Sequence, residues 1–256
     1  MFNWNSNQYL KFKNERTQPA IDLANRISFD NPKSIIDIGC GPGNSTEVLQ
    51  RRFPNAKIIG IDSSSEMIEK AKSQHNDIDF VCCDVNDLFH GKEKYDVVFS
   101  NACIQWIPNH NELLKNLMNL LNDNGVLAVQ IPYNQDEPIQ KIIEEATLST
   151  KWVDCFENPR EKYVLKFSEY YYDLLTHVSH NFEMWQTTYF HKMKSYESIL
   201  EWYRGTGLRP YLAELNENQK TDFENEIFNR IMQEYPMQSN GDIIFRFPRL
   251  FFTAMK

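Results

Sequence analysis

Three glycines at alternate positions, Gly39, Gly41 and Gly43, follow a short run of branched apolar residues and precede a polar segment. Glycine lets a backbone turn sharply and approach a ligand closely. Asp37, two residues before the first glycine, would repel a pyrophosphate but could pair with an ammonium group. The third glycine comes one residue earlier than in the dinucleotide fingerprint, in which Asn44 would be a glycine. The pattern therefore indicates a site for a nucleotide-like ligand that carries a cationic group.

Two further acidic residues end the apolar runs that follow the glycines. Asp62 lies 23 residues after Gly39, close to the spacing of about 20 at which an acid meets ribose hydroxyls in such folds. Asp84 ends the next run. Because parallel strands end at the same edge of a sheet, Asp37, Asp62 and Asp84 should lie along the edge where ligands bind. The sequence thus predicts one ligand cleft built from three strands.

Strand-like and helix-like segments alternate up to Pro132. Short apolar runs predict buried strands at 35–38, 58–62, 78–84, 95–101 and 125–131. Between them, Asn44, Ser45 and Thr46 offer helix caps, and the serines at 63–65 offer another set. An apolar face through Leu121 predicts a helix that ends at the turn 122–125. This rhythm indicates a doubly wound, Rossmann-like α/β sheet with right-handed crossovers.

The regular alternation stops after residue 132, and the second half is richer in aromatic residues. We expect a single domain over residues 1–256, with a core at about 29–135 that is completed by strands near 182–191 and 242–256. Helical lid elements are expected at about 138–180 and 194–236. Ahead of the first strand, Pro19 suits the first turn of a helix. That segment would either pack over the ligand cleft or cover the sheet.

Composition narrows the class of protein further. The net charge of −8 argues against nucleic acid and anionic membranes as partners. No apolar run approaches the roughly 20 residues of a membrane span, and the first residues lack signal-peptide character. Five cysteines without a C-x-x-C pair fit reduced thiols in the cytoplasm, and six histidines without ligand spacing predict no metal site. The oligomeric state stays open.

The glycine motif at 37–43 resembles motif I of the class I S-adenosylmethionine-dependent methyltransferases. Over nearly its whole length the chain also resembles the trans-aconitate 2-methyltransferase family. The matching blocks lie at 4–5, 9–10, 16, 19–20, 37–46, 60–64, 101–102, 105–106, 187–189, 191, 206–210, 240–241 and 247–251. The resemblance implies S-adenosyl-L-methionine as the cofactor. It also implies an enzyme that esterifies a carboxylate of a small polycarboxylic acid, trans-aconitate above all.

The resemblance also implies which residues bind each ligand. Asp62 would meet the ribose hydroxyls, Asp84 with the Val85 amide the adenine, and Asp37 with the glycine loop the methionine part. The full cofactor set is Asp37, Gly39, Gly41, Gly43, Asn44, Asp62, Ser63, Met67, Asp84, Val85, Asn101, Ala102 and Trp106. Residues proposed to bind the acid are Arg209, Arg249, Arg16, Tyr189, His191 and Trp202. Such arginines also form structural ion pairs, and large aromatics are more often core.

No catalytic residue is expected, because a carboxylate with an ordinary pKa near ~4 is already ionised at neutral pH and needs no general base. Three alternatives compete with this interpretation. A methyltransferase of the same fold could act on another carboxylic acid, such as a carrier-bound malonyl group, and would then need a basic surface for its carrier. A non-catalytic S-adenosylmethionine-binding protein is a second alternative. The third alternative is an NAD-dependent dehydrogenase. It is disfavoured by Asp37 and by Asn44, which stands where the dinucleotide fingerprint has its last glycine.

Overall fold

A computed structural model describes residues 13–157 and 166–256, with side chains from residue 17 onward. The described strands form a seven-stranded sheet in the order β3-β2-β1-β4-β5-β7-β6. The strands are β1 (Ser34–Ile38), β2 (Lys57–Asp62), β3 (Asp79–Cys82), β4 (Tyr95–Asn101), β5 (Leu121–Pro132), β6 (Phe182–Met193) and β7 (Ile243–Met255). β1 to β5 run parallel, and β7 pairs antiparallel with β5. The predicted α/β sheet is confirmed.

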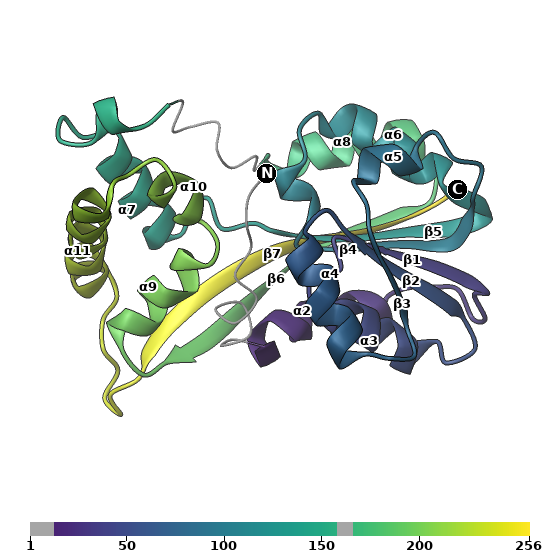
Figure 1. The fold of residues 1–256 in the computed structure, drawn as a ribbon, viewed down its shortest axis with the longest axis horizontal. Coiled ribbons are helices and arrows are strands. Elements are labelled where there is room, and N and C mark those ends of the chain that lie inside the picture. The colour runs from purple at the N-terminus through teal and green to yellow at the C-terminus, as the bar shows by residue number, and fades with distance from the viewer. Residues whose placement is uncertain (1–12, 158–165) are drawn as a thin grey trace. The chain divides into compact units, whose positions relative to one another are not determined.

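Helices connect the parallel strands and cover both sides of the sheet. They are α2 (Lys13–Asn25), α3 (Asn44–Arg52), α4 (Ser65–Gln74), α5 (Val85–Leu88), the short 3₁₀ helix η1 (Ile104–Trp106), α6 (His110–Asn119) and α8 (Ser168–Val178). Figure 1 shows α2, α3 and α4 on one side of these strands and α5, α6 and α8 on the other. α2 packs against α3 and β5, so the described part of the N-terminal segment covers the sheet.

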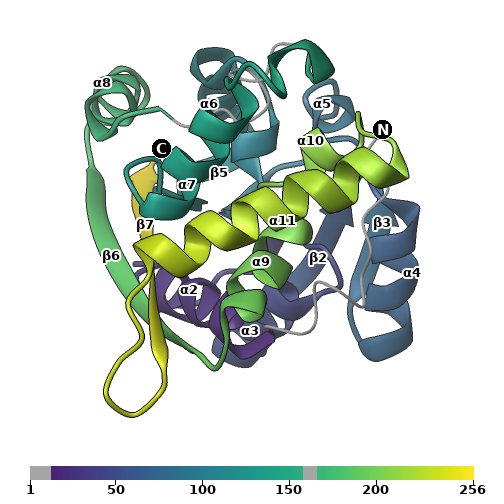
Figure 2. The same ribbon diagram turned by 90° about the vertical axis from the view of Figure 1, so that its left-hand side faces the viewer.

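The remaining helices follow the break in rhythm at Pro132. They are α7 (Pro138–Thr147), the 3₁₀ helix η2 (Val153–Cys155), α9 (Tyr196–Arg204), α10 (Arg209–Leu212) and α11 (Glu217–Glu234). α11 packs against α7 and α9, and Figure 2 shows it crossing in front of α9. It buries Phe223, Ile227 and Ile231 completely, at the i, i+4 spacing of one helix face. Asn216 and Gln219 start this helix with a capping box.

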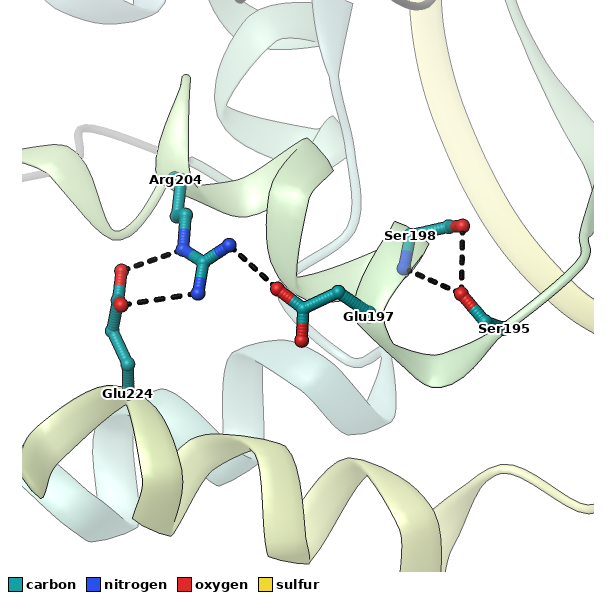
Figure 3. Close-up of polar contacts among 5 residues, drawn as sticks. All are labelled: Ser195, Glu197, Ser198, Arg204 and Glu224. Carbon is teal, nitrogen blue, oxygen red and sulfur yellow. Dashed lines mark hydrogen bonds and ion pairs between the residues drawn. The ribbon is translucent and has the colours of Figure 1, made fainter. Parts of the chain in front are cut away.

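An ion pair between Arg204 and Glu224 connects α9 to α11. Arg204, at the end of α9, donates two hydrogen bonds to the Glu224 carboxylate of α11, from Nε at 2.8 Å and Nη2 at 3.1 Å. Its Nη1 contacts Glu197 at 2.6 Å (Figure 3). Ser195 caps the other end of α9 by accepting a hydrogen bond from the Ser198 amide. A planar guanidinium shared between two carboxylates fixes both the distance and the direction of the contact.

The chain divides into two compact units. The first contains the described residues up to Pro132, together with Lys166–Thr187 and Arg249–Lys256. The second contains residues 133–157 and Thr188–Pro248. Of the predicted lid range 138–180, α7 belongs to the second unit and α8 to the first. The expected single domain with a helical lid therefore stays a prediction.

Three local predictions from the sequence were wrong. Pro19 lies inside α2 and not in its first turn. α6 ends at Asn119, and Leu121 already begins β5, because the chain turns at Leu120 and Tyr95 of β4 pairs with Leu121. α3 has Gly43 at its N-cap in a left-handed conformation and no side-chain cap, since the hydroxyls of Ser45 and Thr46 bond elsewhere. In contrast, Ser64 caps α4 as predicted, accepting from the Met67 amide.

Among the described helices, none is both long enough and apolar enough to cross a membrane.

Candidate active site

The glycine loop joins β1 to α3 at the carboxyl edge of the parallel strands. Gly39 (φ +70°) and Gly41 (φ +55°) adopt left-handed conformations that other residues rarely reach. A Cβ on Gly39 would overlap the Cys103 side chain, whereas a Cβ on Gly41 would have no atom of the described structure within 4 Å. Gly39 is thus required for packing, and the space beside the Gly41 backbone is open within the described structure.

Asp37 is the second-to-last residue of β1, two residues before Gly39, and it is completely buried. Its Oδ2 accepts hydrogen bonds from the hydroxyls of Ser45, at 2.6 Å, and Thr46, at 2.7 Å. Its Oδ1 is buried and accepts no hydrogen bond within the described parts of the chain. The pKa of Asp37 is raised to about 6, mainly by burial and to a smaller extent by the charge of Asp62, while the hydrogen bonds from the two hydroxyls lower it. An oxygen of this kind is suited to accept from a cationic donor.

Asn44 and Asp62 flank the glycine loop. Asn44 is 7% exposed, and both polar atoms of its amide are buried without a hydrogen-bond partner in the described structure. Asp62 Oδ2 accepts from the Gly41 amide at 3.0 Å, and Oδ1 accepts from the Ser64 amide at 2.9 Å. Burial raises the pKa of Asp62. The carboxylate therefore fixes the loop, and its further lone pairs can accept from hydroxyls.

The next strand end carries the residues predicted at an adenine ring. Asp84 is exposed and caps α5, accepting from the backbone and side-chain nitrogens of Asn86 at 2.9 and 2.8 Å. Val85 is buried in the first turn of α5. Met67 is buried in α4, and Ser63 is exposed between Asp62 and the Ser64 cap. The acid that follows β3 is thus tied to its own loop through one of its two oxygens.

On the other side of β1, the end of β4 carries Asn101, Ala102 and Trp106. Asn101 Oδ1 is buried and has no hydrogen-bond partner among described residues. Ala102 has a positive φ of 55°, and its amide donates to the Gln130 carbonyl at 2.9 Å. Trp106, in η1, is half-buried. A non-glycine residue in the left-handed region is strained, and such residues concentrate at functional sites.

Arg249 of β7 lies at the same edge of the sheet. It pairs in register with Pro132, the last residue of β5, and is 4% exposed. Its Nη1 donates to Gln130 Oε1 at 3.4 Å. Gln130 is in turn the register partner of Asn101 in β4. β7 thus brings one buried guanidinium into the row of strand ends that also holds Asp37 and Asn101.

Other predicted substrate residues belong to the second unit. Tyr189 and His191 of β6 have parallel rings 6.2 Å apart, and His191 stacks on Trp202 of α9 at 4.9 Å. Phe245 and Phe247 of β7 complete this aromatic cluster. Trp202 is 2% exposed and His191 is 8% exposed, so this cluster is core in character.

Two arginines of the predicted set are placed elsewhere. Arg209 begins the short helix α10 in the second unit and is half-buried. Arg16 falls within α2, and its side chain lies outside the described residues. Arg246, which strand alternation predicts on the opposite side from Arg249, is exposed and pairs with Glu137 at 3.3 Å.

Sequence reasoning missed four residues of this site. The sequence predicts Ser45 and Thr46 as helix caps, but hydroxyls in the first turn after a glycine loop can also reach back to the strand before it. Cys103 packs against Gly39, and burial raises its pKa to about 12. Gln130 interrupts an apolar strand, and a single amide in such a run is the signal that could have found it.

Comparison with known proteins identifies the class. A family described as "Methyltransferase domain" matches residues 29–201. The YcgJ protein from Bacillus subtilis has a similar fold, with a TM-score of 0.61 at 13% identity, over 93% of this chain and 98% of that one.

Closer relatives narrow the class to a family. Proteins named trans-aconitate 2-methyltransferase from Enterobacter sp. (strain 638) and Shigella flexneri are each 40% identical over 256 residues, which is 100% of this chain and 99% of each relative. The chain belongs to the trans-aconitate 2-methyltransferase family of methyltransferases.

Proposed function

We propose that this enzyme transfers the methyl group of S-adenosylmethionine to a carboxylate of trans-aconitate. The observation that carries the proposal is the 40% identity to enzymes of that name along the whole chain. A likeness confined to the glycine loop and its strands would support only the methyltransferase fold. Here it extends through the second half, where the candidates Arg209 and Arg249 lie.

The described residues fit the cofactor. S-adenosylmethionine carries an α-ammonium group, and the buried Oδ1 of Asp37 is an acceptor that no described residue occupies. Asn44 offers both a donor and an acceptor for the neighbouring carboxylate and ammonium. Asp62 is assigned to the ribose, Asp84 and the Val85 amide to the adenine. Ser63, Met67, Ala102 and Trp106 complete the walls in this proposal.

The acid needs positive charge in a protein of net charge −8. Arginine holds a carboxylate through two parallel hydrogen bonds, and Arg249 lies at the cofactor edge of the sheet. Arg209 is proposed as a second cation and Arg16 as a third. Tyr189, His191 and Trp202 stay candidates for the apolar wall of the acid site, although their mutual stacking also suits a structural core.

The residues assigned to the site orient and desolvate the reactants and do not move protons. When bound, S-adenosylmethionine supplies a methyl group on a positively charged sulfur. The attacking carboxylate is already ionised at neutral pH, so no general base is required. Asp37 and the glycine loop would hold the donor, and Arg249 would hold the acid, so that the reacting atoms meet in line. Limiting water around the two opposite charges favours their neutralisation.

A transfer assay tests the proposal. Purified protein is incubated with methyl-labelled S-adenosylmethionine and trans-aconitate, and label in a base-labile ester is counted. Parallel reactions contain other di- and tricarboxylates, a monocarboxylic acid and no acid. We expect trans-aconitate to give the highest kcat/KM and the monocarboxylic acid very little. Cofactor binding without methylation of any acid would favour a non-catalytic binding protein. Preference for a carrier-bound malonyl group would favour the other alternative.

Variants of the two arginines test the acid site. Arg249→Ala should raise the KM for trans-aconitate at least tenfold, because breaking a buried charge pair costs about 2–5 kcal/mol. The KM for the cofactor should stay near the native value. Arg249→Lys should restore only part of the affinity for trans-aconitate, because lysine keeps the charge but lacks the planar guanidinium that binds both carboxylate oxygens. Arg209→Ala tests the second candidate separately, and Arg246→Ala, an exposed arginine of β7, is the matched control. A native KM in Arg249→Ala would make that arginine structural.

A further inference from the structure

One amide interrupts an otherwise apolar stretch of β5. Leu127, Ala128, Val129 and Ile131 are fully buried, and Gln130 among them is fully buried too. Burying a primary amide is costly unless its polar atoms are used. In register, Gln130 lies between Asn101 of β4 and Phe251 of β7. It therefore stands between the strand end assigned to the cofactor and the strand that carries Arg249.

Hydrogen bonds fix which way this amide points. A guanidinium only donates, so the atom facing Arg249 Nη1 at 3.4 Å is the acceptor Oε1. The other polar atom of the amide is then the donor Nε2, and it is buried without an acceptor in the described structure. The backbone at this point is held as well, because the Gln130 carbonyl accepts from the Ala102 amide. A buried donor held in place beside a guanidinium is a place for an anionic oxygen.

The choice of an amide over an acid matters for charge. A glutamate at this position would have the same shape and would add a negative charge beside Arg249, whereas glutamine orients the guanidinium without adding a charge. We propose that Gln130 is a substrate-positioning residue. Its Oε1 orients Arg249, and its Nε2 donates to the same carboxylate of the acid that Arg249 binds. This inference rests on the proposed function, since it names a further contact to that substrate.

Two substitutions separate positioning from packing. Gln130→Met keeps the length and volume of the side chain and removes both polar atoms. Gln130→Glu keeps the shape and pairs with Arg249. Thr253→Val is the matched control, because Thr253 is a buried polar residue of the same strand as Arg249 and pairs with Ala128. For each protein, the KM of trans-aconitate, kcat, the Kd of S-adenosylmethionine and the melting temperature are measured.

We expect Gln130→Met to raise the KM of trans-aconitate about tenfold, the effect of losing one good hydrogen bond to a charged group, with the cofactor Kd within about twofold of native. Gln130→Glu should raise that KM at least as much while its melting temperature stays at or above the native value. A structural role would not separate affinity from stability in this way. The control should match the native protein.

Each contrary outcome has a distinct meaning. If the native protein does not methylate trans-aconitate, the proposed function fails and this inference fails with it. If the native protein is active and folded Gln130→Met retains the native KM, the inference alone is overturned. If Gln130→Met does not fold, Gln130→Glu decides: a folded variant with a native KM overturns the inference, and a raised KM supports it.

Discussion

Asp37 holds a carboxylate where water does not reach, and only one of its two oxygens is used by the described protein. Ser45 and Thr46 bind the other oxygen, so the unused Oδ1 is held in one place. The cost of this arrangement is seen in the raised pKa. A ligand ammonium would lower that pKa again by pairing with the ionised form. Cofactor affinity and pH are therefore linked at this residue.

The first prediction concerns that linkage. Because the ammonium pairs with ionised Asp37, the affinity for S-adenosylmethionine should fall as the pH falls through about 6. The loss should approach about tenfold per pH unit below that value. Calorimetric titrations between pH 5 and pH 8 measure it. Asp37→Asn should bind more weakly and without this pH dependence, and a pH-independent affinity of the native protein would contradict the assignment.

A second prediction concerns the stability of the cofactor-free protein. The pKa of Asp37 is about 6 in the folded state against an ordinary value of 3.8. The folded state thus binds the proton more tightly, so this contribution is greatest below about pH 4 and is lost as the pH rises through about 6. Asp37→Asn should therefore raise the free energy of unfolding at pH 7 by up to about 3 kcal/mol. Urea unfolding at pH 7 and pH 5 checks it, and the gain should shrink at the lower pH.

At the scale of elements, the sequence predicted the strands better than their connections. Buried runs such as Ile35, Ile36 and Ile38 of β1 are predicted directly from the sequence, because a strand covered on both sides is mostly apolar. The ends of the helices are harder to predict, because each is decided by the local contacts of one or two residues. Pro19 lies inside α2, although proline is usually found in the first turn of a helix. Leu121 belongs to β5 and not to α6, because its pairing with Tyr95 outweighs the helical spacing of the apolar residues. The glycine loop and its acids were predictable, but the bonds of Ser45 and Gln130 depend on neighbouring strands.

The contact between α9 and α11 gives a prediction at this scale. Arg204 binds the Glu224 carboxylate through two hydrogen bonds and also Glu197, in a partly buried position (Figure 3). Arg204→Ala should lower the free energy of unfolding by about 1–2 kcal/mol, more than an exposed pair contributes. Arg51→Ala, which removes an exposed i, i+4 pair with Glu47, is the control and should cost about 0.5 kcal/mol or less. Equal melting temperatures for the two variants would show that the ion pairs of Arg204 contribute no more than an exposed pair does.

At the scale of the whole molecule, the sequence predicted the class and the family, and both are confirmed. The second half was harder to interpret, because its helices follow no repeating strand rhythm and its aromatics suit a core as well as a pocket. His191 illustrates the difficulty, since it stacks on Tyr189 and Trp202. The expected cytoplasmic location and the assignment of individual site residues stay predictions.

The proposed reaction has a pH signature that involves the complete enzyme. With both substrates saturating, the ammonium would keep Asp37 ionised and the acid is already ionised, so kcat should be nearly constant from about pH 6 to pH 8. Stopped assays over that range measure it, with kcat/KM for the cofactor falling at the acidic end as the internal comparison. A step in kcat near pH 7 that disappears in His191→Ala would reveal an obligatory base and refute the proposed mechanism.

The crowding at Gly39 constrains which mutations the gene can accept. A methyl group at position 39 would overlap Cys103, and φ +70° would strain any side chain there even if residue 103 were made smaller. A compensating change at 103 therefore cannot rescue Gly39→Ala. In a saturation library scored for activity, position 39 should accept glycine alone, whereas position 103 should accept residues up to about the size of cysteine. Survival of larger residues at 103 would show that the loop can shift to make room.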